Sequence, residues 1–310
     1  MTHPSYGPVR IMMLHRVMHS VDAAFGLPTC YRIRGTALTT GEFMAFLDDL
    51  PRVLPLRTLE TRVGASWPGP GVILTFDDGY REHAELVGPL LAARGLTASF
   101  YVSTGLHADA TEVGVVDAWY WLLDHAQARI ARVILPDGET HIAPVDTLES
   151  KSRWVAGPPK EALLGAPAAV QRMMLETLAA SLNVVLPAAL ASSLYMGRDE
   201  WQVLLRLGMR LGAHGVSHVR LSQLDRTTLC SEVHESIAEI RGLTGEAPPF
   251  CYPDGSYNNA VIDVVSEAGA SSAVTCDPGP CHDSVSRLRL PRYFVQPATL
   301  GASLLASLRD

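Results

Sequence analysis

The sequence predicts one α/β domain built on parallel strands, and three observations lead to this expectation. Short apolar runs recur along the chain, helix-length amphipathic segments separate them, and polar residues follow several runs directly. The run VILTF at 72–76, for example, precedes a helical segment at 81–94 and a second run, TASFYV, at 97–102. Strand, helix and strand with such a connection form a βαβ unit with parallel pairing. A chain of 310 residues fits a barrel or partial barrel of this kind.

The remaining elements continue the same alternation. The first helix, at 40–50, has a threonine cap and apolar residues at helical spacing, and Pro51 stops it. Gly95 ends the helix at 81–94. The further strands are expected at 9–14, 210–213, 249–252, 272–275 and 287–295, and the further helices at 199–207, 226–242 and 259–268.

The middle of the chain departs from this pattern. Strand signals are weak between 105 and 196, and alanine and leucine are abundant. We expect helices at 117–132 and 168–182, with a turn at AGPPK (156–160). The chain is therefore interpreted as a single domain over 1–310 with a helical insertion at 105–196. Its aromatic residues Trp119, Tyr120 and Trp121 are expected to pack, with substrate contact as the alternative.

The composition limits the classes of function. Hydrophobic residues make up 47% of the chain, and the net charge of −7 argues against a nucleic-acid partner. The five cysteines fit no zinc module, which favours free thiols in a reducing compartment. No signal-peptide pattern or membrane span stands out, so a cytoplasmic protein is expected, although a chain trimmed of its signal peptide would look the same. The oligomeric state cannot be predicted.

Two adjacent carboxylates, Asp77 and Asp78, follow the strand at 72–76 directly. Further along, His214 and His218 stand four residues apart, a spacing that lets both imidazoles meet one ion. Two histidines and one carboxylate are a common set for a catalytic divalent cation. Neighbours in an extended chain point to opposite sides, so Asp78 can bind the metal while Asp77 faces water as a general base. The alternative is a simple helix cap.

The motifs TFDDGY, AHGVSH and FCYPDG resemble the first three motifs of the polysaccharide deacetylases, the NodB-homology or carbohydrate esterase family 4 group. IMMLHRV, AVTCDPG and LPRYFV are similar to further segments of a bacterial branch of that family. Only 105–196 has no counterpart. The resemblance implies a distorted (β/α) barrel of the NodB type and a metal-dependent hydrolase, which removes acetyl groups from N-acetylated sugars.

The resemblance also implies roles for individual residues. Asp77 matches the catalytic base, and Asp78, His214 and His218 match the metal ligands, for which Zn²⁺ is expected and Co²⁺, Ni²⁺ or Mn²⁺ would also serve. Asp254 follows the proline of the third motif, where the family's backbone N–H helps to hold the oxyanion.

Two roles have no matching residue in the family's usual place. The late segment LRLPRYF lacks the histidine that usually protonates the leaving amine, so His15, at the end of the first strand, is our candidate acid, with simple packing as the alternative. Cys251 replaces the arginine of the third motif. Arg292 is expected to take over by pairing with Asp77, with an ordinary surface arginine as the alternative. His83 is expected on an exposed helix.

Three functions remain open at this point. The first is de-N-acetylation of an amino sugar or oligosaccharide. The second keeps the chemistry but acts on a nucleotide-linked, lipid-linked or small-molecule amide, as a deformylase or amidase. The third is an inactive barrel used as a carbohydrate-binding module, against which the complete set of ligands and base argues.

Overall fold

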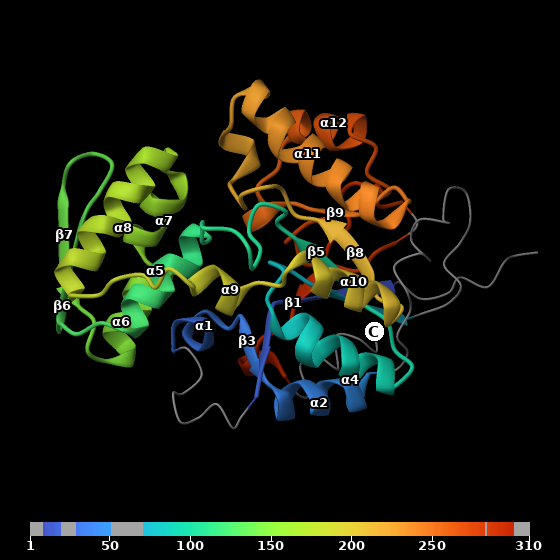
Figure 1. Cartoon of the computed structure of the whole chain (residues 1–310), viewed down its shortest axis with the longest axis horizontal. Helices are drawn as coiled ribbons and strands as arrows, with labels where there is room; N and C mark the ends of the chain where they lie inside the picture. Colours follow the sequence, from blue (N-terminus) through green and yellow to red (C-terminus); the bar gives the residue numbers. More distant parts are fainter. Residues whose placement is uncertain (1–8, 20–28, 51–70, 283, 301–310) are drawn as a thin grey trace, which may run out of the picture.

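The computed structural model describes residues 9–19, 29–50, 71–282 and 284–300. Its centre is a seven-stranded sheet in which all neighbouring strands are parallel (Figure 1). In spatial order the strands are β10 (Ala273–Val274), β9 (Phe250–Cys251), β8 (Arg210–Ala213), β5 (Ser99–Val102), β4 (Gly71–Phe76), β1 (Val9–Leu14) and β11 (Tyr293–Phe294). The parallel α/β architecture predicted from the sequence is confirmed.

The segment before β11 connects the two edges of this sheet. The backbone N–H of Leu290 bonds to Ala273 in β10 at 2.9 Å, and Tyr293 and Phe294 pair with β1. The sheet therefore curls into a distorted barrel, because the segment that ends in one edge strand, β11, also bonds to the other edge strand, β10.

Successive side chains along each strand point alternately into the barrel and toward the outer helices. In β4, Ile73 belongs to a small inner cluster with residues of other strands, whereas Leu74 and Phe76 belong to a larger outer cluster. Gly212 in β8 is required by this interior, because a Cβ there would come within 2.5 Å of the Tyr101 ring. The period of two places Thr75 and Asp77 on the inner side, with Ile73.

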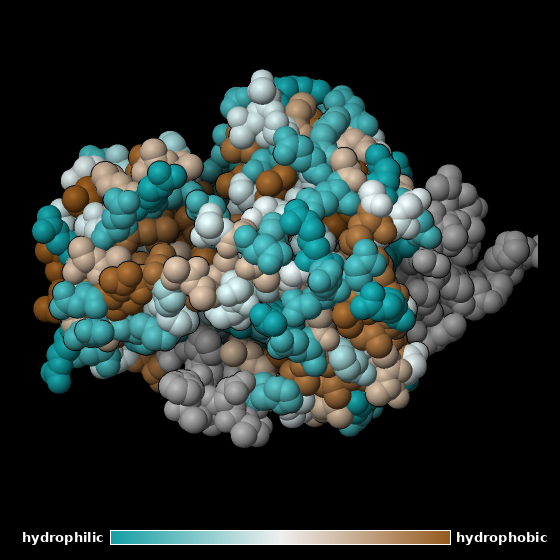
Figure 2. Space-filling view, in the orientation of Figure 1, coloured by the Kyte–Doolittle hydropathy of each residue, from teal (hydrophilic) through white to brown (hydrophobic). Residues whose placement is uncertain are grey.

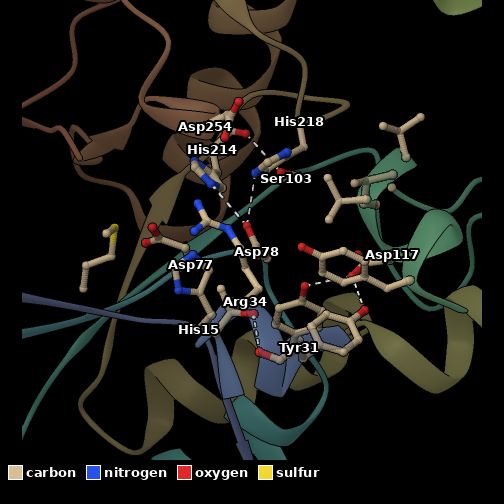
Figure 3. Close-up of a pocket in the computed structure, with 18 of the residues that line it drawn as sticks. His15, Tyr31, Arg34, Asp77, Asp78, Ser103, Asp117, His214, His218 and Asp254 are labelled. Carbon is tan, nitrogen blue, oxygen red and sulfur yellow. Dashed lines mark hydrogen bonds and ion pairs between the residues drawn. The ribbon is translucent and has the colours of Figure 1, made fainter. Parts of the chain in front are cut away.

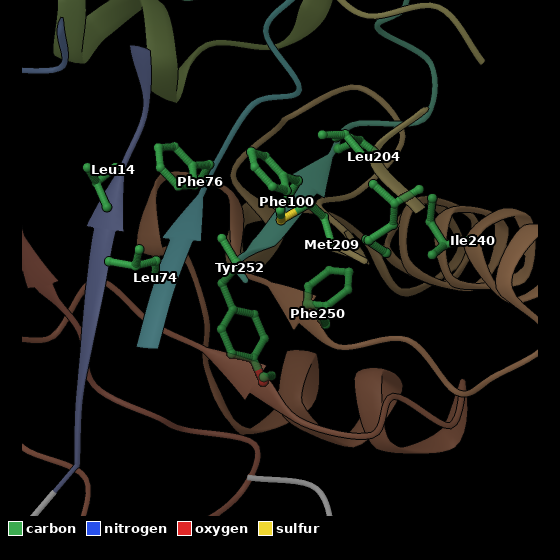
Figure 4. Packing of buried hydrophobic residues seen from close by; sticks show 14 of the residues in the cluster. Leu14, Leu74, Phe76, Phe100, Leu204, Met209, Ile240, Phe250 and Tyr252 are labelled. Atoms are coloured by element: carbon green, nitrogen blue, oxygen red, sulfur yellow. The ribbon is translucent and has the colours of Figure 1, made fainter. Parts of the chain in front are cut away.

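Helices pack on the outer face of the sheet and complete its core (Figure 4). They are α2 (Thr40–Asp49), the π-helix η2 (His83–Val87), α4 (Gly88–Ala93), α10 (Arg198–Arg206), α11 (Arg226–Thr244) and α12 (Asn259–Glu267). Thr39 caps α2 in a capping box with Glu42, and Gly95 ends the α4 segment with a φ of 66°. The predicted helices are thus present, while Pro51 lies outside the described residues.

A short strand pair and three 3₁₀ turns complete the barrel part of the chain as described. The helix α1 (Thr29–Arg34) lies between β2 (Arg16–Met18) and β3 (Ala37–Thr39), which pair with each other in parallel. Short 3₁₀ turns follow at η3 (Leu221–Gln223), η4 (Pro253–Gly255) and η5 (Pro297–Thr299).

The segment 105–196 forms a lobe beside the barrel (Figure 1). It has its own hydrophobic cluster, centred on Trp119, Trp154 and Leu178, and a notch in the surface separates it from α11 and α12 (Figure 2). Its elements are α5 (Val115–Asp124), β6 (Ile130–Ile134), β7 (Thr140–Pro144), α6 (Leu148–Ala156), α7 (Pro158–Gly165), α8 (Ala168–Leu182) and α9 (Leu190–Leu194).

The lobe differs from the sequence prediction in two places. A helix over 117–132 is wrong beyond Asp124, because β6 pairs with β7 in an antiparallel hairpin and buries alternate residues. The turn at 156–160 is reduced to Gly157, since the two following prolines open α7, as proline readily does in a first helical turn. The helix at 168–182 is confirmed. Among the described residues, no helix has the length and apolarity required to cross a bilayer.

Candidate active site

The polar residues that follow the inner strands meet at one end of the barrel (Figure 3). His15 follows β1, Asp77 follows β4, His214 follows β8 and Asp254 lies after β9. All four line one cavity of about 310 Å³. The carboxyl ends of parallel strands share one edge of the sheet, which is why residues so distant in sequence converge here.

Asp78 faces both histidines of the HxxxH motif. Its Oδ1 lies 3.4 Å from Nε2 of His214 and 3.2 Å from Nε2 of His218. Left-handed backbone at Asp78 (φ 75°) and His218 (φ 57°) turns these side chains away from the regular strand and loop directions. Burial opposes the charge of His218, but the Asp78 carboxylate outweighs it and raises the pKa of His218 to about 9.

The histidine loop is held in place by contacts that the sequence analysis did not anticipate. The carbonyl of Cys251 accepts a hydrogen bond of 2.8 Å from Nδ1 of His214. The proton therefore lies on Nδ1, and the lone pair of Nε2 can bind a metal ion. Glu232 on α11 accepts the backbone N–H groups of Val216 at 2.8 Å and Ser217 at 3.0 Å. The sequence does contain a signal for this contact: Glu232 lies three residues after Leu229, on the otherwise apolar face of the predicted helix.

Two groups of side chains have the spacing of a metal site, and their chemistry separates them. Asp77, His214 and Cys251 form the first group, but Nη2 of Arg292 lies 3.2 Å from the Cys251 sulfur and 2.8 Å from Asp77. A second cation would be repelled there, and burial raises the pKa of the Cys251 thiol. The second group is Asp78, His214 and His218, whose one carboxylate and two imidazoles suit a divalent cation. All five cysteines are free.

Asp77 is held by Arg292 in a buried, two-pronged ion pair. Nη1 and Nη2 of the guanidinium each lie 2.8 Å from a carboxylate oxygen. Thr75 and the carbonyl of Thr275 fix the guanidinium from two further sides. Burial favours the neutral acid, but Arg292 outweighs it and lowers the pKa of Asp77. The predicted pairing is therefore present, and the alternative of a surface arginine is wrong, because Arg292 is 1% exposed.

His15 lies beside both aspartates with one unused ring nitrogen. Its Nδ1 is buried and has no hydrogen-bond partner among the described residues, and burial lowers its pKa. Its ring meets Phe294 edge-on at 5.3 Å. Its carbonyl accepts a hydrogen bond of 2.7 Å from Nε2 of His83. The expectation of an exposed His83 is wrong: the residue is fully buried in the π-helix.

Asp254 points away from the metal-ligand set toward Arg220, with which it forms an ion pair. Arg220 also pairs with Glu161 of the lobe at 2.9 Å. The backbone of Asp254 is left-handed (φ 52°), so this residue contributes to the cavity through a sharp turn.

The lobe and α1 supply the opposite wall of the cavity. Asp117 of α5 accepts hydrogen bonds from the hydroxyls of Tyr31, Tyr80 and Tyr195, the second at 2.9 Å. Burial raises the pKa of the Asp117 carboxyl. The sequence analysis did not find this cluster, because its four members come from four separate segments.

The three lobe aromatic residues have different environments. Trp119 packs, as expected, and donates its indole N–H to the carbonyl of Trp154. Tyr120 lines the cavity, and Trp121 stacks on His125 at 3.7 Å. Packing therefore describes all three residues, and Tyr120, which is 1% exposed and belongs to the lobe's cluster, also borders the cavity.

Comparisons with known proteins agree with this geometry. Residues 181–273 match the family model for polysaccharide deacetylase. The Streptococcus pyogenes deacetylase PplD, solved in complex with acetate, matches with a TM-score of 0.62 and 16% identity over 98% of this chain and 100% of that one. IcaB from Ammonifex degensii matches with a TM-score of 0.55 and 12% identity over 98% of this chain and 97% of that one. A de-N-acetylase from Aggregatibacter actinomycetemcomitans matches with a TM-score of 0.56 and 15% identity over 97% of this chain and 100% of that one. No curated protein sequence matches the chain significantly.

The family match and the fold confirm the resemblance that the motifs indicated. Over residues 181–273 the chain matches the polysaccharide deacetylase family, and its fold resembles that of the NodB-type barrels. These matches indicate a hydrolase of carbon–nitrogen bonds other than peptide bonds, with de-N-acetylation of carbohydrate as its general activity.

Proposed function

We propose that this protein is a metal-dependent de-N-acetylase of an N-acetylated amino sugar or oligosaccharide, built as one catalytic domain with the lobe at 105–196. One observation carries the proposal. Asp78 faces His214 and His218 at 3.4 and 3.2 Å, while the adjacent Asp77 forms its ion pair with Arg292. The two carboxylates therefore have different partners within one cavity.

The residues Asp78, His214 and His218 would hold the divalent cation. Zn²⁺ is the first choice for one carboxylate and two imidazoles, and Co²⁺, Ni²⁺ or Mn²⁺ would also fit this set. Such an ion would supply Lewis-acid polarisation and would lower the pKa of a water molecule toward neutrality.

The chain's own residues would move the protons. Asp77, kept ionised by Arg292, would accept a proton from the water whose oxygen attacks the amide carbonyl. The backbone N–H of Asp254 would stabilise the negative charge that develops on the carbonyl oxygen. His15 would donate a proton to the departing nitrogen as the C–N bond breaks, which yields acetate and a free amine.

The second function, deformylation or hydrolysis of another small N-acyl compound, uses the same residues. The lobe wall favours it in one respect: Asp117 and Tyr120 line the same cavity as the ligand set, and a cavity with a second wall suits a small substrate better than a long polymer. An inactive binding module is disfavoured, because the base, its arginine and the complete ligand set are all present.

A substrate panel tests the proposal. The purified protein is assayed for acetate or formate release from N-acetyl sugars, chitooligosaccharides and N-formyl compounds, before and after a chelator and after Zn²⁺ is returned. We expect acetate release that the chelator abolishes and Zn²⁺ restores. Formate release alone would favour the second function. No release from any compound by the Zn²⁺-loaded protein would contradict both.

A further inference from the structure

A lysine is buried in the lobe wall of the cavity, and no carboxylate of the described residues pairs with it. Lys160, in the first turn of α7, is 7% exposed and lines the cavity. Its ammonium donates a hydrogen bond of 2.8 Å to the hydroxyl of Tyr120 and lies 4.9 Å from the centre of that ring. Within the described part of the chain, it forms no ion pair.

A second cation lies on the same cavity. Arg34, at the end of α1, lines it as well (Figure 3), and across residues 9–19, 29–50, 71–282 and 284–300 it has no carboxylate within ion-pair distance. The two positive groups are close enough to influence each other: burial and then Arg34 lower the pKa of Lys160 to about 8. Lys160 therefore remains mainly protonated at neutral pH.

The nearest described carboxylates form no ion pair with Lys160 or Arg34, although two of them stabilise the charge of Lys160 from a distance. Asp254 and Glu161 both lie near Lys160, but each forms its ion pair with Arg220. Asp117 is engaged by three tyrosine hydroxyls. Among the described residues, Arg34 and Lys160 are thus positive groups of the cavity wall that form no ion pair.

A buried ammonium without an anion is costly, and a methylene chain of similar volume would avoid that cost. The arrangement becomes favourable when a negative group enters the cavity and accepts charge-assisted hydrogen bonds. We propose that Lys160 and Arg34 form a subsite for an anionic group, a carboxylate or a phosphate, carried by the substrate whose amide lies at Asp78, His214 and His218. This inference rests on the proposed function and deepens it, since it names an acidic N-acyl sugar as the substrate class.

Three related compounds test the subsite: N-acetylglucosamine as the neutral probe, N-acetylglucosamine 6-phosphate and N-acetylmuramic acid. The value of kcat/KM for acetate release is measured for each. We expect at least one acidic compound to exceed the neutral one by about tenfold or more, because a hydrogen bond to a charged group contributes about 1.5–3 kcal/mol. The phosphate and carboxylate arms distinguish the two sources of negative charge.

Substitutions then test which residues cause the preference for acidic compounds. Lys160→Met should reduce the ratio of acidic to neutral kcat/KM by about tenfold, and Arg34→Gln by less, because Arg34 is exposed to solvent. Lys160→Arg keeps the charge and should retain part of the preference. Arg172→Gln, an exposed arginine on α8, is the matched control and should leave the ratio unchanged. Thermal unfolding of each variant verifies that it is folded.

The outcomes separate this inference from the proposed function. Equal kcat/KM for all three compounds, or a preference that survives in Lys160→Met, would overturn the subsite while leaving the deacetylase intact. If no compound releases acetate, the proposed function fails. The affinity of the same compounds, measured by calorimetry, then tests the subsite by itself. Binding of an acidic compound that Lys160→Met weakens about tenfold would support it, and failure of both acidic compounds to bind would refute it.

Discussion

The two walls of the cavity are built in different ways. The barrel wall carries Asp77, Asp78 and His214, which stand directly after strands and owe their positions to the sheet. The lobe wall carries Asp117 and Lys160, which belong to α5 and α7 and are held by contacts between distant segments. The barrel wall contains the groups that our proposal assigns to chemistry. The lobe wall contains the groups that would choose the substrate.

This division suggests how such an enzyme can change its substrate. The strand ends must keep their geometry, because a misplacement of about 1 Å can lower the rate by about 10²-fold. A lobe with its own hydrophobic cluster can vary without disturbing them. Changes in the barrel wall should therefore reduce turnover, and changes in the lobe wall should alter affinity or stability.

The largest effect is expected for His15→Ala. Loss of a general acid lowers turnover by roughly 10²–10⁴-fold, while bound metal should stay at the wild-type level, because His15 is not among the three ligands. Turnover and metal content are measured on the same preparation. His19→Ala, at an exposed position on the same segment, is the control. Unchanged turnover in His15→Ala would remove this residue from the mechanism.

Arg292→Met should damage both stability and turnover. It leaves Asp77 buried without its counter-charge, a change that typically costs about 3–5 kcal/mol, and it allows Asp77 to take up a proton. Chemical unfolding and the pH dependence of kcat/KM are the measurements. The exposed Arg289→Met provides the comparison. Normal kinetics in Arg292→Met would show that Asp77 does not need this partner.

Asp117→Asn should weaken the lobe wall with a smaller effect on chemistry. The amide nitrogen cannot accept a hydroxyl hydrogen bond, so at least one of Tyr31, Tyr80 and Tyr195 loses its acceptor, at a cost of about 1–3 kcal/mol. We expect lower stability and a raised KM, with a smaller change in kcat. The control Asp146→Asn, on the lobe surface, should leave both stability and KM unchanged. A large fall in kcat with unchanged KM would place Asp117 in the chemistry instead.

The smallest effect is a gain in stability for Lys160→Met. The folded-state pKa of Lys160, about 8, lies below the unfolded value of about 10.4, so the folded state binds fewer protons between these values. Wild-type stability should therefore rise with pH across that window, by at most about 3 kcal/mol. At pH 7 the variant should exceed the wild type by about 1–2 kcal/mol after loss of the Tyr120 contact, and the gap should narrow toward pH 10. A less stable variant at pH 7 would mean that Lys160 is not a costly buried charge.

The barrel wall was the predictable part of the site. A buried run that ends in Asp77 and Asp78, followed much later by an HxxxH pair, determines its location through strand periodicity and the shared edge of parallel strands. The pairing of Arg292 with Asp77 followed from a missing arginine in the third motif. The first inference needed only local patterns and the order of elements, whereas the second needed the resemblance to the family's third motif.

The lobe wall was not predictable, because its contacts join segments with no common local signal. Asp117 meets Tyr31 and Tyr195 only after the lobe packs against α1. The first residues of β6 lie where the end of a helix was expected, and His83 is buried against Phe76 and Phe100 with a hydrogen bond to the carbonyl of His15. In each case tertiary packing, not local propensity, determines the outcome.

The central claim is that the neighbours Asp77 and Asp78 do different work, and one paired measurement tests it directly. Bound metal and turnover are determined for Asp77→Asn and Asp78→Asn under the same conditions. Asp77→Asn should keep wild-type metal and lose turnover by roughly 10²–10⁴-fold. Asp78→Asn should lose the metal itself, since one of three ligands is weakened. Equal metal content in both variants, or loss of metal in Asp77→Asn alone, would contradict the account.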